Sequence, residues 1–446
     1  MSLFRDKTGR PGPSTWELGS YPQGQGDYPV TGVSWYEAAA FAEFAGKSVP
    51  TVYHWDQAAG RHPDEASEIA PISNFGGKGL AAVGNYSGLG PYGTYDMAGN
   101  AKEWCWNSTG TENKRYVMGG AWDEPAYMFT SPDAQSPFER SPRYGFRLVR
   151  YINPPKASAI AMLQSSFRDF NRERPISEEA FRAYRSLYAY DKSPLNAVVE
   201  SMDDGSESWR KEKVSFDAAY GNERMTAYIY LPRNGSPPYQ TIVFFPGSNA
   251  IFLRSSQDLP LIGIDFMPRS GRAIVFPIFK STFERGDTLK SDVQVPTAFY
   301  RDHVIAWSKD LGRTIDYLET RQDLRTDHLA YYGLSWGSDQ APIMISMEPR
   351  IKLGVLVGGG FDFGKPFPEV DPINFAPHVQ VPVLMVNGRY DFYFPIESSQ
   401  KPMFFSLGTP AKDKRHVVFE TGHVPPNDLM IKEILDWLDR YQGPAR

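Results

Sequence analysis

Short apolar runs recur from about residue 205 to the end of the chain, and most are separated by stretches with helical patterning. Each run ends at a glycine, a proline or a charged residue, as in "TIVFFPG", "HLAYYGL", "VPVLMVNG" and "RHVVFE". Strands that alternate with helices predict a mostly parallel sheet covered on both faces. The first two runs, within 212–232, flank a Gly-Asn turn and predict an antiparallel hairpin. We therefore predict an α/β domain over 205–446 with about eight strands.

The first third of the chain has a different composition and a different secondary-structure pattern. Residues 1–151 are rich in Trp, Tyr and Gly and show one clear helix, which begins at Ser34 with Glu37 completing a capping box. This pattern predicts an irregular α+β domain. The prolines of "INPPK" then predict a linker, followed by two helical stretches, so that 152–204 is expected to bridge the domains. A length of 446 residues also favours two cores over one.

Composition narrows the function classes. The net charge is −5 and no long run of Lys or Arg appears, which argues against a nucleic-acid partner. No apolar run is long enough to span a membrane and no signal-peptide pattern is present. Cys105 is the single cysteine, so an intrachain disulfide is excluded and a reducing, cytoplasmic location is expected. The polar, Gly- and Pro-rich beginning predicts that the chain is cut from a longer parent.

The string "GLSWGS" contains a Gly-x-Ser-x-Gly centred on Ser335, and "GVSWYE" around Ser34 nearly repeats it. Ser335 follows a buried-strand pattern and precedes a helix, which is the setting of a nucleophile elbow. Ser34 opens a capping box, and Tyr36 stands where the second glycine would be. The context predicts a nucleophile at Ser335 and a helix cap at Ser34; the alternative for Ser335 is an ordinary turn serine.

Partners for Ser335 follow in the order typical of this kind of sheet, with the acid before the histidine. Asp391 lies just past the run "VPVLMVNG", and His423 lies just past the last run. Both are expected at the carboxyl edge of the sheet, where such folds build their sites. Asp362 in "GGGFDF" is the rival for the acid, and an ordinary loop histidine is the alternative for His423.

These residues predict acyl transfer. His423 would take the proton of Ser335 as its oxygen attacks a carbonyl, while Asp391 orients the imidazole. The oxyanion needs two backbone N–H donors. We expect one from Trp336, directly after the nucleophile, and the other from Ser248 or Asn249, in the loop after the run "TIVFFPG".

With "FFPGSNA", "GLSWGS", "NGRYD" and "TGHVPP" in this order, 205–446 resembles an α/β-hydrolase of the dienelactone hydrolase, acetyl-esterase and prolyl-oligopeptidase-like group. The resemblance implies hydrolysis of a small ester, thioester or peptide through an acyl-enzyme, without a cofactor. Dienelactone hydrolases use a cysteine nucleophile, so Ser335 favours the esterase or peptidase branches. Segment 250–296 is expected to cap the site, and its aromatic residues favour an apolar or aromatic acyl group.

The first domain resembles the formylglycine-generating enzyme, or sulfatase-modifying-factor, family. "YPVTGVSWYEAAAFAEFAGKSVPT", "YGTYDMAGNAKEW", "GGAW" and "YGFRL" carry the likeness, which implies a C-type-lectin-like fold with a shortened leading segment. The family binds copper through two cysteines between its last two motifs, and 123–143 contains none. We therefore expect no oxidase activity, with Cys105 a buried apolar residue.

The same resemblance implies a structural calcium site in the segment "DMAGNAKE". Its ligands would be the carboxylates of Asp96 and Glu103 and the carbonyls of Gly99 and Ala101, because calcium prefers hard oxygen ligands. The alternative is a turn with a surface glutamate.

Bacterial proteins that join a Ser/Thr kinase to these two modules resemble this arrangement. An upstream kinase domain in the parent is therefore expected, but no kinase activity in this chain, since it has no His-Arg-Asp, Asp-Phe-Gly or Gly-rich loop with its lysine. The sequence thus predicts a serine hydrolase with a non-catalytic module. The alternative is a non-catalytic binding or scaffold region of a kinase signalling protein.

Overall fold

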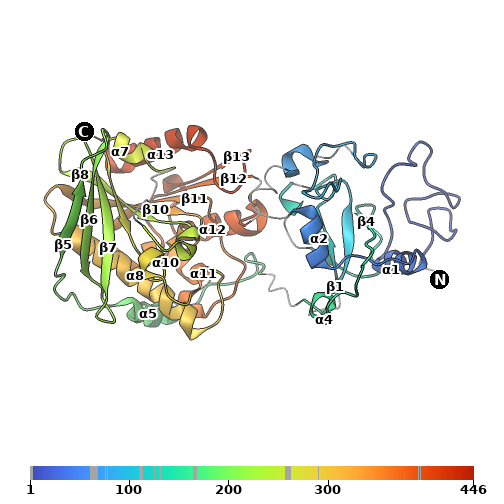
Figure 1. The fold of residues 1–446 in the computed structure, drawn as a ribbon, viewed down its shortest axis with the longest axis horizontal. Helices are drawn as coiled ribbons and strands as arrows, with labels where there is room; N and C mark the ends of the chain where they lie inside the picture. The colour runs from blue at the N-terminus through green and yellow to red at the C-terminus, as the bar shows by residue number, and fades with distance from the viewer. Residues whose placement is uncertain are drawn as a thin grey trace. The chain divides into compact units, whose positions relative to one another are not determined.

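A computed structural model describes most of the chain. The described residues are 4–60, 69–75, 77, 79–109, 114–124, 126–129, 133–163, 168–256, 263–289, 291–389, 391 and 393–445. They form two compact units, one of residues 1–166 with 389–395 and the other of residues 167–388 with 396–446 (Figure 1).

A nine-stranded mixed sheet is the frame of the second unit, in the order β13-β12-β11-β10-β8-β9-β7-β6-β5. Strands from β13 to β9 pair in parallel, whereas β5, β6, β7 and β9 pair antiparallel. The strands are β5 (Val198–Asp203), β6 (Trp209–Asp217), β7 (Arg224–Pro232), β8 (Tyr239–Phe245), β9 (Ala273–Pro277), β10 (Leu324–Leu334), β11 (Ile351–Val357), β12 (Val383–Gly388) and β13 (Lys414–Phe419). This architecture confirms the predicted α/β-hydrolase sheet.

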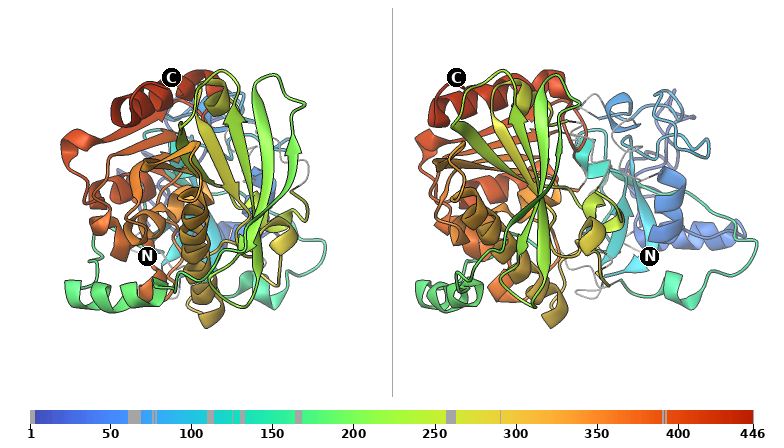
Figure 2. Two further views of the ribbon diagram at one scale, coloured as in Figure 1. Left: turned by 90° about the vertical axis from the view of Figure 1, so that its left-hand side faces the viewer. Right: turned by 60° about the vertical axis from the view of Figure 1, so that its left-hand side comes forward.

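Helices cover both faces of this sheet, as Figure 2 shows. They are α5 (Glu178–Arg185), α6 (Asn249–Phe252), α7 (Phe266–Arg269), α8 (Ala298–Leu318), α9 (Trp336–Asp339), α10 (Ala341–Met347), α11 (Pro372–Phe375), α12 (Lys401–Ser406) and α13 (Asn427–Gln442), with a π-helical turn at Ile396–Gln400. The period-two alternation of β10 sends Tyr331 into the core under α8 and Tyr332 into the core under α13. Buried residues on both faces explain why the parallel strands read as continuous apolar runs.

Strand β5 lies within the segment that the sequence assigned to the linker. All six of its residues are exposed, and its apolar residues, Val198, Val199 and Met202, do not alternate as those of a half-buried strand would. In the same segment, the expected helical stretches are shorter than predicted, with α4 only at Ala157–Ile160 and α5 at Glu178–Arg185.

The first unit confirms the prediction of an irregular α+β domain. A small sheet has the order β3-β2-β1-β4. The elements are α1 (Trp35–Phe44), α2 (Val52–Ala59), β1 (Lys102–Ser108), β2 (Arg115–Met118), β3 (Ala134–Gln135) and β4 (Tyr144–Gly145). The capping box at the start of α1 is present: the Ser34 N–H donates to Glu37 Oε2 at 2.8 Å, and the Glu37 N–H donates to Ser34 Oγ at 3.2 Å.

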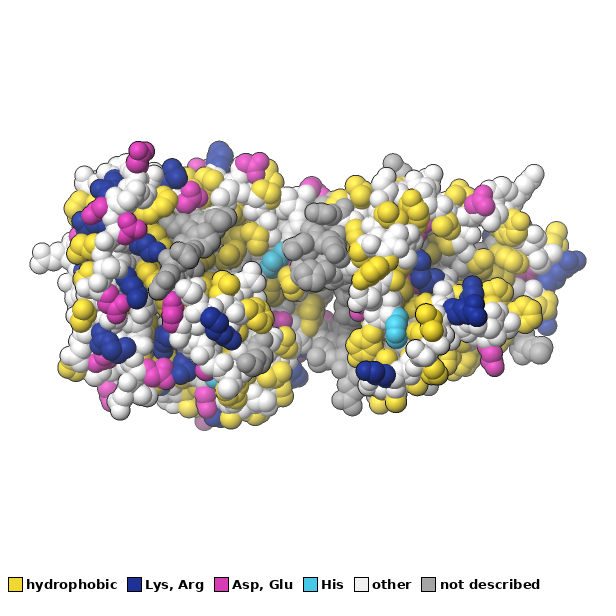
Figure 3. All heavy atoms as spheres, in the orientation of Figure 1, with side chains coloured by type: hydrophobic (Ala, Val, Ile, Leu, Met, Phe, Trp, Pro, Cys, Tyr) yellow, Lys and Arg dark blue, Asp and Glu magenta, His cyan; other side chains and the backbone are white. Residues whose placement is uncertain are grey.

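Helix α1 is apolar on its outer side as well as its inner side. It buries Trp35 and Ala38, yet leaves Phe41 51% and Phe44 87% exposed. On the face that Figure 3 shows, hydrophobic side chains cover much of the first unit.

Candidate active site

Ser335 occupies a strained turn between β10 and α9. Its backbone has φ 52° and ψ −109°, a conformation that a residue with a Cβ rarely adopts. The Ser335 N–H donates to the carbonyl of Val357 at 2.8 Å, which ties the turn to the end of β11. This geometry is that of a nucleophile elbow, in which the sheet over-determines a strained serine.

The two glycines of the motif are required by close backbone contacts. A Cβ at Gly333 would lie 2.5 Å from the carbonyl oxygen of Gly337, and a Cβ at Gly337 would lie 2.3 Å from that of Phe245. Neither residue has a positive φ, so crowding rather than backbone conformation selects glycine here.

His423 lies in the loop that follows β13, and its Nε2 is 2.7 Å from Ser335 Oγ. When Nε2 carries no proton, the hydroxyl donates to it, which is the contact that proton abstraction needs. The structure therefore brings together two side chains that are 88 residues apart in the sequence.

The two candidate acids lie in loops after neighbouring strands. Asp391 is fully buried, and its Oδ1 accepts the N–H groups of Tyr393 at 2.9 Å and Phe394 at 3.0 Å. Gly388, three residues before it, has no room for a Cβ, which would lie 1.7 Å from the carbonyl oxygen of Gly422. The last residue of β12 thus packs against the residue that precedes His423. The role of Asp391 stays a prediction.

The rival acid, Asp362, follows β11. Its Oδ1 accepts the Gly364 N–H at 2.7 Å, and burial raises the pKa of its carboxyl group. Its own N–H donates to Asp339 Oδ1 at 3.1 Å. Asp362 is therefore built into a group of carboxylates beside the elbow.

The expected oxyanion donors lie next to Ser335. Trp336 is the first residue of α9, and Asn249 is the first residue of α6, with Ser248 just before it. A Cβ at Gly247 would lie 3.5 Å from Ser335 Cβ, so this loop runs alongside the elbow. The arrangement can present backbone N–H groups to a carbonyl held at Ser335.

Sequence reasoning missed two carboxylates at this site. Asp339 is buried four residues after Ser335, and burial raises the pKa of its carboxyl group well above the usual range. Asp292 belongs to the expected cap, 250–296, and burial raises the pKa of its carboxyl group. Positions 257–262 and 290 of that cap lie outside the described residues. The only signal for Asp339 was its place in the motif "GLSWGSD", and Asp292 had none.

The residues of the expected calcium site do not fit a calcium ion. Arg147 forms a bidentate ion pair with Glu103, at 2.6 Å from Nε to Oε2 and 2.7 Å from Nη2 to Oε1. The indole of Trp55 also donates to Glu103 Oε2 at 2.7 Å. Asp96 accepts the Gly84 N–H at 2.7 Å. A guanidinium thus stands where calcium would need the Glu103 oxygens.

The other two expected ligands are packed into the fold. A Cβ at Gly99 would lie 2.4 Å from the carbonyl oxygen of Asn74, and Ala101 is buried. Cys105, which was not expected to bind copper, is buried in the core of the first unit. Among the described residues, no three His, Cys, Asp or Glu side chains are grouped to hold a metal ion.

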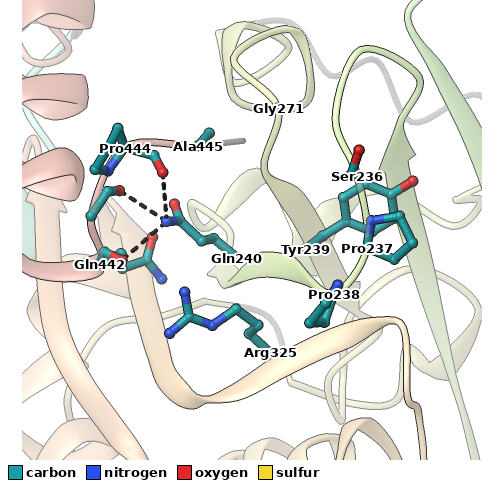
Figure 4. A pocket seen from close by; sticks show the side chains of 11 residues that line it. Ser236, Pro237, Pro238, Tyr239, Gln240, Gly271, Arg325, Gln442, Pro444 and Ala445 are labelled. Carbon is teal, nitrogen blue, oxygen red and sulfur yellow. Dashed lines mark hydrogen bonds between the residues drawn. The ribbon is translucent and has the colours of Figure 1, made fainter.

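A hollow at the opposite edge of the large sheet has a different character (Figure 4). It lies where β8 and β10 begin, and the residues after α13 close one side. Gln240 Nε2 donates there to the carbonyls of Gln442, Gly443 and Pro444 at 2.9 to 3.2 Å. Its lining residues include no histidine and no cysteine. Ligands of parallel sheets bind at the carboxyl edge, where Ser335 lies, rather than at this one.

Comparison with known proteins assigns the first unit. Residues 7–152 match the family model of the sulfatase-modifying factor enzyme 1-like domain. The chain carries this domain. The predicted resemblance of the first unit is therefore confirmed.

Two curated relatives match the chain over 156 and 100 residues. Serine/threonine-protein kinase pkn1 of Chlamydia pneumoniae is 30% identical over 156 residues, covering 29% of this chain and 25% of that protein. The formylglycine-generating enzyme of Thermomonospora curvata is 32% identical over 100 residues, covering 18% of this chain and 33% of that protein. The chain thus spans a quarter to a third of the length of these relatives.

Among solved structures, the chain is similar to an acetyl xylan esterase from Paenibacillus sp. R4. The two share 15% identity with a TM-score of 0.46, over 60% of this chain and 96% of the esterase.

No helix in the described part of the chain combines the length and apolar character needed to cross a bilayer.

Proposed function

We propose that the second unit is a serine hydrolase with Ser335 as nucleophile and His423 as general base. One observation carries the proposal: His423 Nε2 lies 2.7 Å from the hydroxyl of a serine held in a strained strand-to-helix turn. A serine in an ordinary turn has neither the strain nor a histidine within hydrogen-bonding distance.

The geometry supports a two-step acyl transfer. Ser335 Oγ attacks the carbonyl carbon of the substrate while its proton passes to His423 Nε2. The tetrahedral oxyanion accepts hydrogen bonds from the N–H of Trp336 and from that of Ser248 or Asn249. When the intermediate collapses, the imidazolium returns the proton to the leaving oxygen or nitrogen, and Ser335 carries the acyl group.

Water then completes the cycle. It takes the place of the leaving group, loses a proton to His423 and attacks the acyl carbon, which releases a carboxylic acid and restores the Ser335 hydroxyl. Asp391 is our choice for the acid that orients His423, because it follows β12, whose last residue, Gly388, packs against Gly422. Asp391→Asn should then lower kcat far more than Asp362→Asn.

A carboxylic ester of a small molecule is the proposed substrate, with a peptide as the second possibility. Esters have the better leaving group, so a Ser-His site hydrolyses them with less help at the leaving atom than amides need.

We propose that the sulfatase-modifying-factor-like domain is non-catalytic and serves binding, and that the chain acts in the cytoplasm.

The match to pkn1 favours one alternative. The chain would then be a non-catalytic binding region of a larger kinase signalling protein. Under this alternative Ser335 would be chemically inert, so a single experiment separates the two functions.

The test is hydrolysis of 4-nitrophenyl esters of graded chain length, alongside aminoacyl 4-nitroanilides. We expect ester turnover by the wild type that falls by at least about a thousandfold in Ser335→Ala. Equal rates for wild type and variant across the whole panel would reject the hydrolase and leave the binding region.

A further inference from the structure

A second hollow, of about 500 Å³, lies on the first unit between the start of α2 and the segment that leads into α4. Tyr53 and His54 of α2 line one side, and residues drawn from 151–159 line the other. All of the lining residues belong to the first unit, so the hollow is complete within it. Its volume falls in the range of small-molecule sites.

The two sides of the hollow are held together by a single side-chain amide. Asn107 of β1 is fully buried, and its Oδ1 accepts the N–H of Val52, the residue before Tyr53, at 2.9 Å. Its Nδ2 donates to the carbonyls of Ala159 and Ala161, both at 2.8 Å. One buried group thus satisfies main-chain atoms on both sides, and the hollow is a preformed part of the fold.

The inner nitrogen of the His54 ring is already bound within the protein. His54 Nδ1 lies 2.6 Å from the Thr51 hydroxyl and 3.4 Å from the Tyr151 hydroxyl. Each hydroxyl oxygen also accepts a main-chain N–H, from His54 at 3.4 Å and from Thr51 at 3.2 Å, so the hydroxyl protons are left for Nδ1. The neutral ring then carries its proton on Nε2, which has no hydrogen-bond partner among the described residues. His54 therefore offers the hollow an N–H donor.

The lining of the hollow carries one permanent cation and no carboxylate. Lys156 is exposed and forms no ion pair with any residue that the structure describes. A carboxylate in the hollow would balance the ammonium charge and accept the N–H of His54 Nε2, as a charge-assisted hydrogen bond. The charge of the lining therefore favours an anionic ligand.

The remaining walls are mostly flat and apolar. Tyr53 is 53% exposed, and the pyrrolidine rings of Pro154 and Pro155 belong to the other side of the hollow. The rings of His54 and Tyr151 meet edge to face, with centroids 4.8 Å apart and an interplanar angle of 67°. Such walls favour a planar aromatic group over a flexible aliphatic chain, because rings gain from stacked and edge-to-face contacts.

We propose that this hollow binds a small aromatic carboxylate, with its anionic oxygens at Lys156 and His54 Nε2 and its ring against Tyr53. The inference goes beyond the hydrolase reaction and does not depend on it. It gives the binding role of the sulfatase-modifying-factor-like domain a site and a class of ligand. A neutral ring would leave Lys156 without a counter-charge, and an aliphatic acid would lose the ring contacts.

The test is isothermal titration calorimetry on the full chain at low ionic strength, where screening of the charge is weak. Three ligands separate the two features of the proposed class. They are 2-naphthoate, 2-naphthamide, which has the same rings without the charge, and decahydronaphthalene-2-carboxylate, which has the charge without aromatic rings. We expect a Kd of about 1 mM or lower for 2-naphthoate and values at least about fivefold higher for the other two.

Two exposed positions supply the variants, so neither substitution disturbs the core. Lys156→Gln should reduce the preference for 2-naphthoate over 2-naphthamide by about threefold or more, and Tyr53→Ala should raise the Kd of 2-naphthoate by a similar factor. Lys47→Gln is the matched control, because Lys47 is an exposed lysine of the same unit that also lacks an ion pair with the described residues and does not line the hollow. It should keep the wild-type values.

Three results would overturn the inference. One is the absence of saturable heat from 2-naphthoate up to about 10 mM, and another is an equal Kd for the acid and its amide. The third is binding that Lys156→Gln and Tyr53→Ala both leave unchanged, which would place the ligand elsewhere on the chain. None of the three ligands is an ester, so each of these results leaves Ser335-dependent hydrolysis to its own test.

Discussion

The phenol of Tyr331 donates a hydrogen bond to the main-chain carbonyl of Gly337, with 2.6 Å between the two oxygens. Tyr331 is in β10 and Gly337 is two residues beyond Ser335. This bond therefore links the strand before the Ser335 turn to the helix after it. Tyr332, the next residue, is also buried, but its hydroxyl lacks a partner and lies on the other face of the sheet. The pair offers a matched test of what holds the elbow.

Tyr331→Phe should lower the free energy of unfolding by about 1–2 kcal/mol, because the buried Gly337 carbonyl loses its donor. It should also slow acylation of Ser335. Tyr332→Phe removes an unpartnered hydroxyl and should be neutral or slightly stabilising. Urea denaturation of the two variants measures the difference, and equal losses would show that the bond to Gly337 does not stabilise the elbow.

Arg168 anchors the start of the second unit to the loop after β11. Its side chain is 2% exposed and its guanidinium donates to both oxygens of Asp371, at 2.8 and 3.1 Å, and to Glu173 at 2.6 Å. Arg168→Met would leave Asp371 buried without its partner and should cost about 3–5 kcal/mol of stability. Arg172 is 89% exposed and pairs with Asp169, so Arg172→Met should cost less than about 0.5 kcal/mol. Chemical denaturation would contradict this account if the two losses were similar.

His416, on β13, should make stability depend on pH. Burial, with a contribution from Lys401, lowers the pKa of its imidazole to about 4. The unfolded chain binds this proton below about pH 6.5, and the folded chain binds it only below about pH 4. Between these values the unfolded state holds more protons, so stability falls as the pH drops through this window.

The variant that tests this is His416→Gln, which cannot titrate. It should reduce the stability difference between pH 4 and pH 7 by up to about 3 kcal/mol. Urea denaturation at both pH values gives that difference. If wild type and variant lost the same stability on acidification, His416 would not be the group responsible.

Calcium should have no effect on the first unit, because Arg147 already holds the Glu103 carboxylate. We expect no heat in calorimetry with calcium on chelator-treated protein and a change in Tm below about 1 °C. Arg147→Met, which leaves Glu103 without its cation, should instead lower stability by about 2–4 kcal/mol. Saturable heat that disappears in Glu103→Gln would restore the calcium site.

The sequence revealed those parts of the fold that have a local signal. The apolar runs located β8 to β13, and the crowding at Gly333 and Gly337 could be inferred because an elbow requires it. The exposed strand β5 had no apolar pattern to find. Its pairing with β6 depends on backbone hydrogen bonds, which many side chains permit.

Contacts across long separations set the rest of the site. Glu103 meets Arg147 from 44 residues away, and the sequence gives no sign that a guanidinium rather than a metal ion would hold that carboxylate. Gln294 likewise meets Asp339 from 45 residues away, and its Nε2 donates to Asp339 Oδ2. Ser335 and His423, by contrast, could be paired because their order along the chain and their places after strands follow the fold's topology.

The central claim is that Ser335 is an activated nucleophile, and labelling by a fluorophosphonate probe tests it most directly. The matched controls are Ser34→Ala, which changes the serine of the near-copy motif, and His423→Gln, which removes the base. We predict that intact-mass spectrometry finds one adduct on the wild type and on Ser34→Ala, a labelling rate at least about a hundredfold lower in His423→Gln, and no adduct on Ser335→Ala. An adduct that forms equally on Ser335→Ala, or no adduct on the folded wild type, would contradict the account.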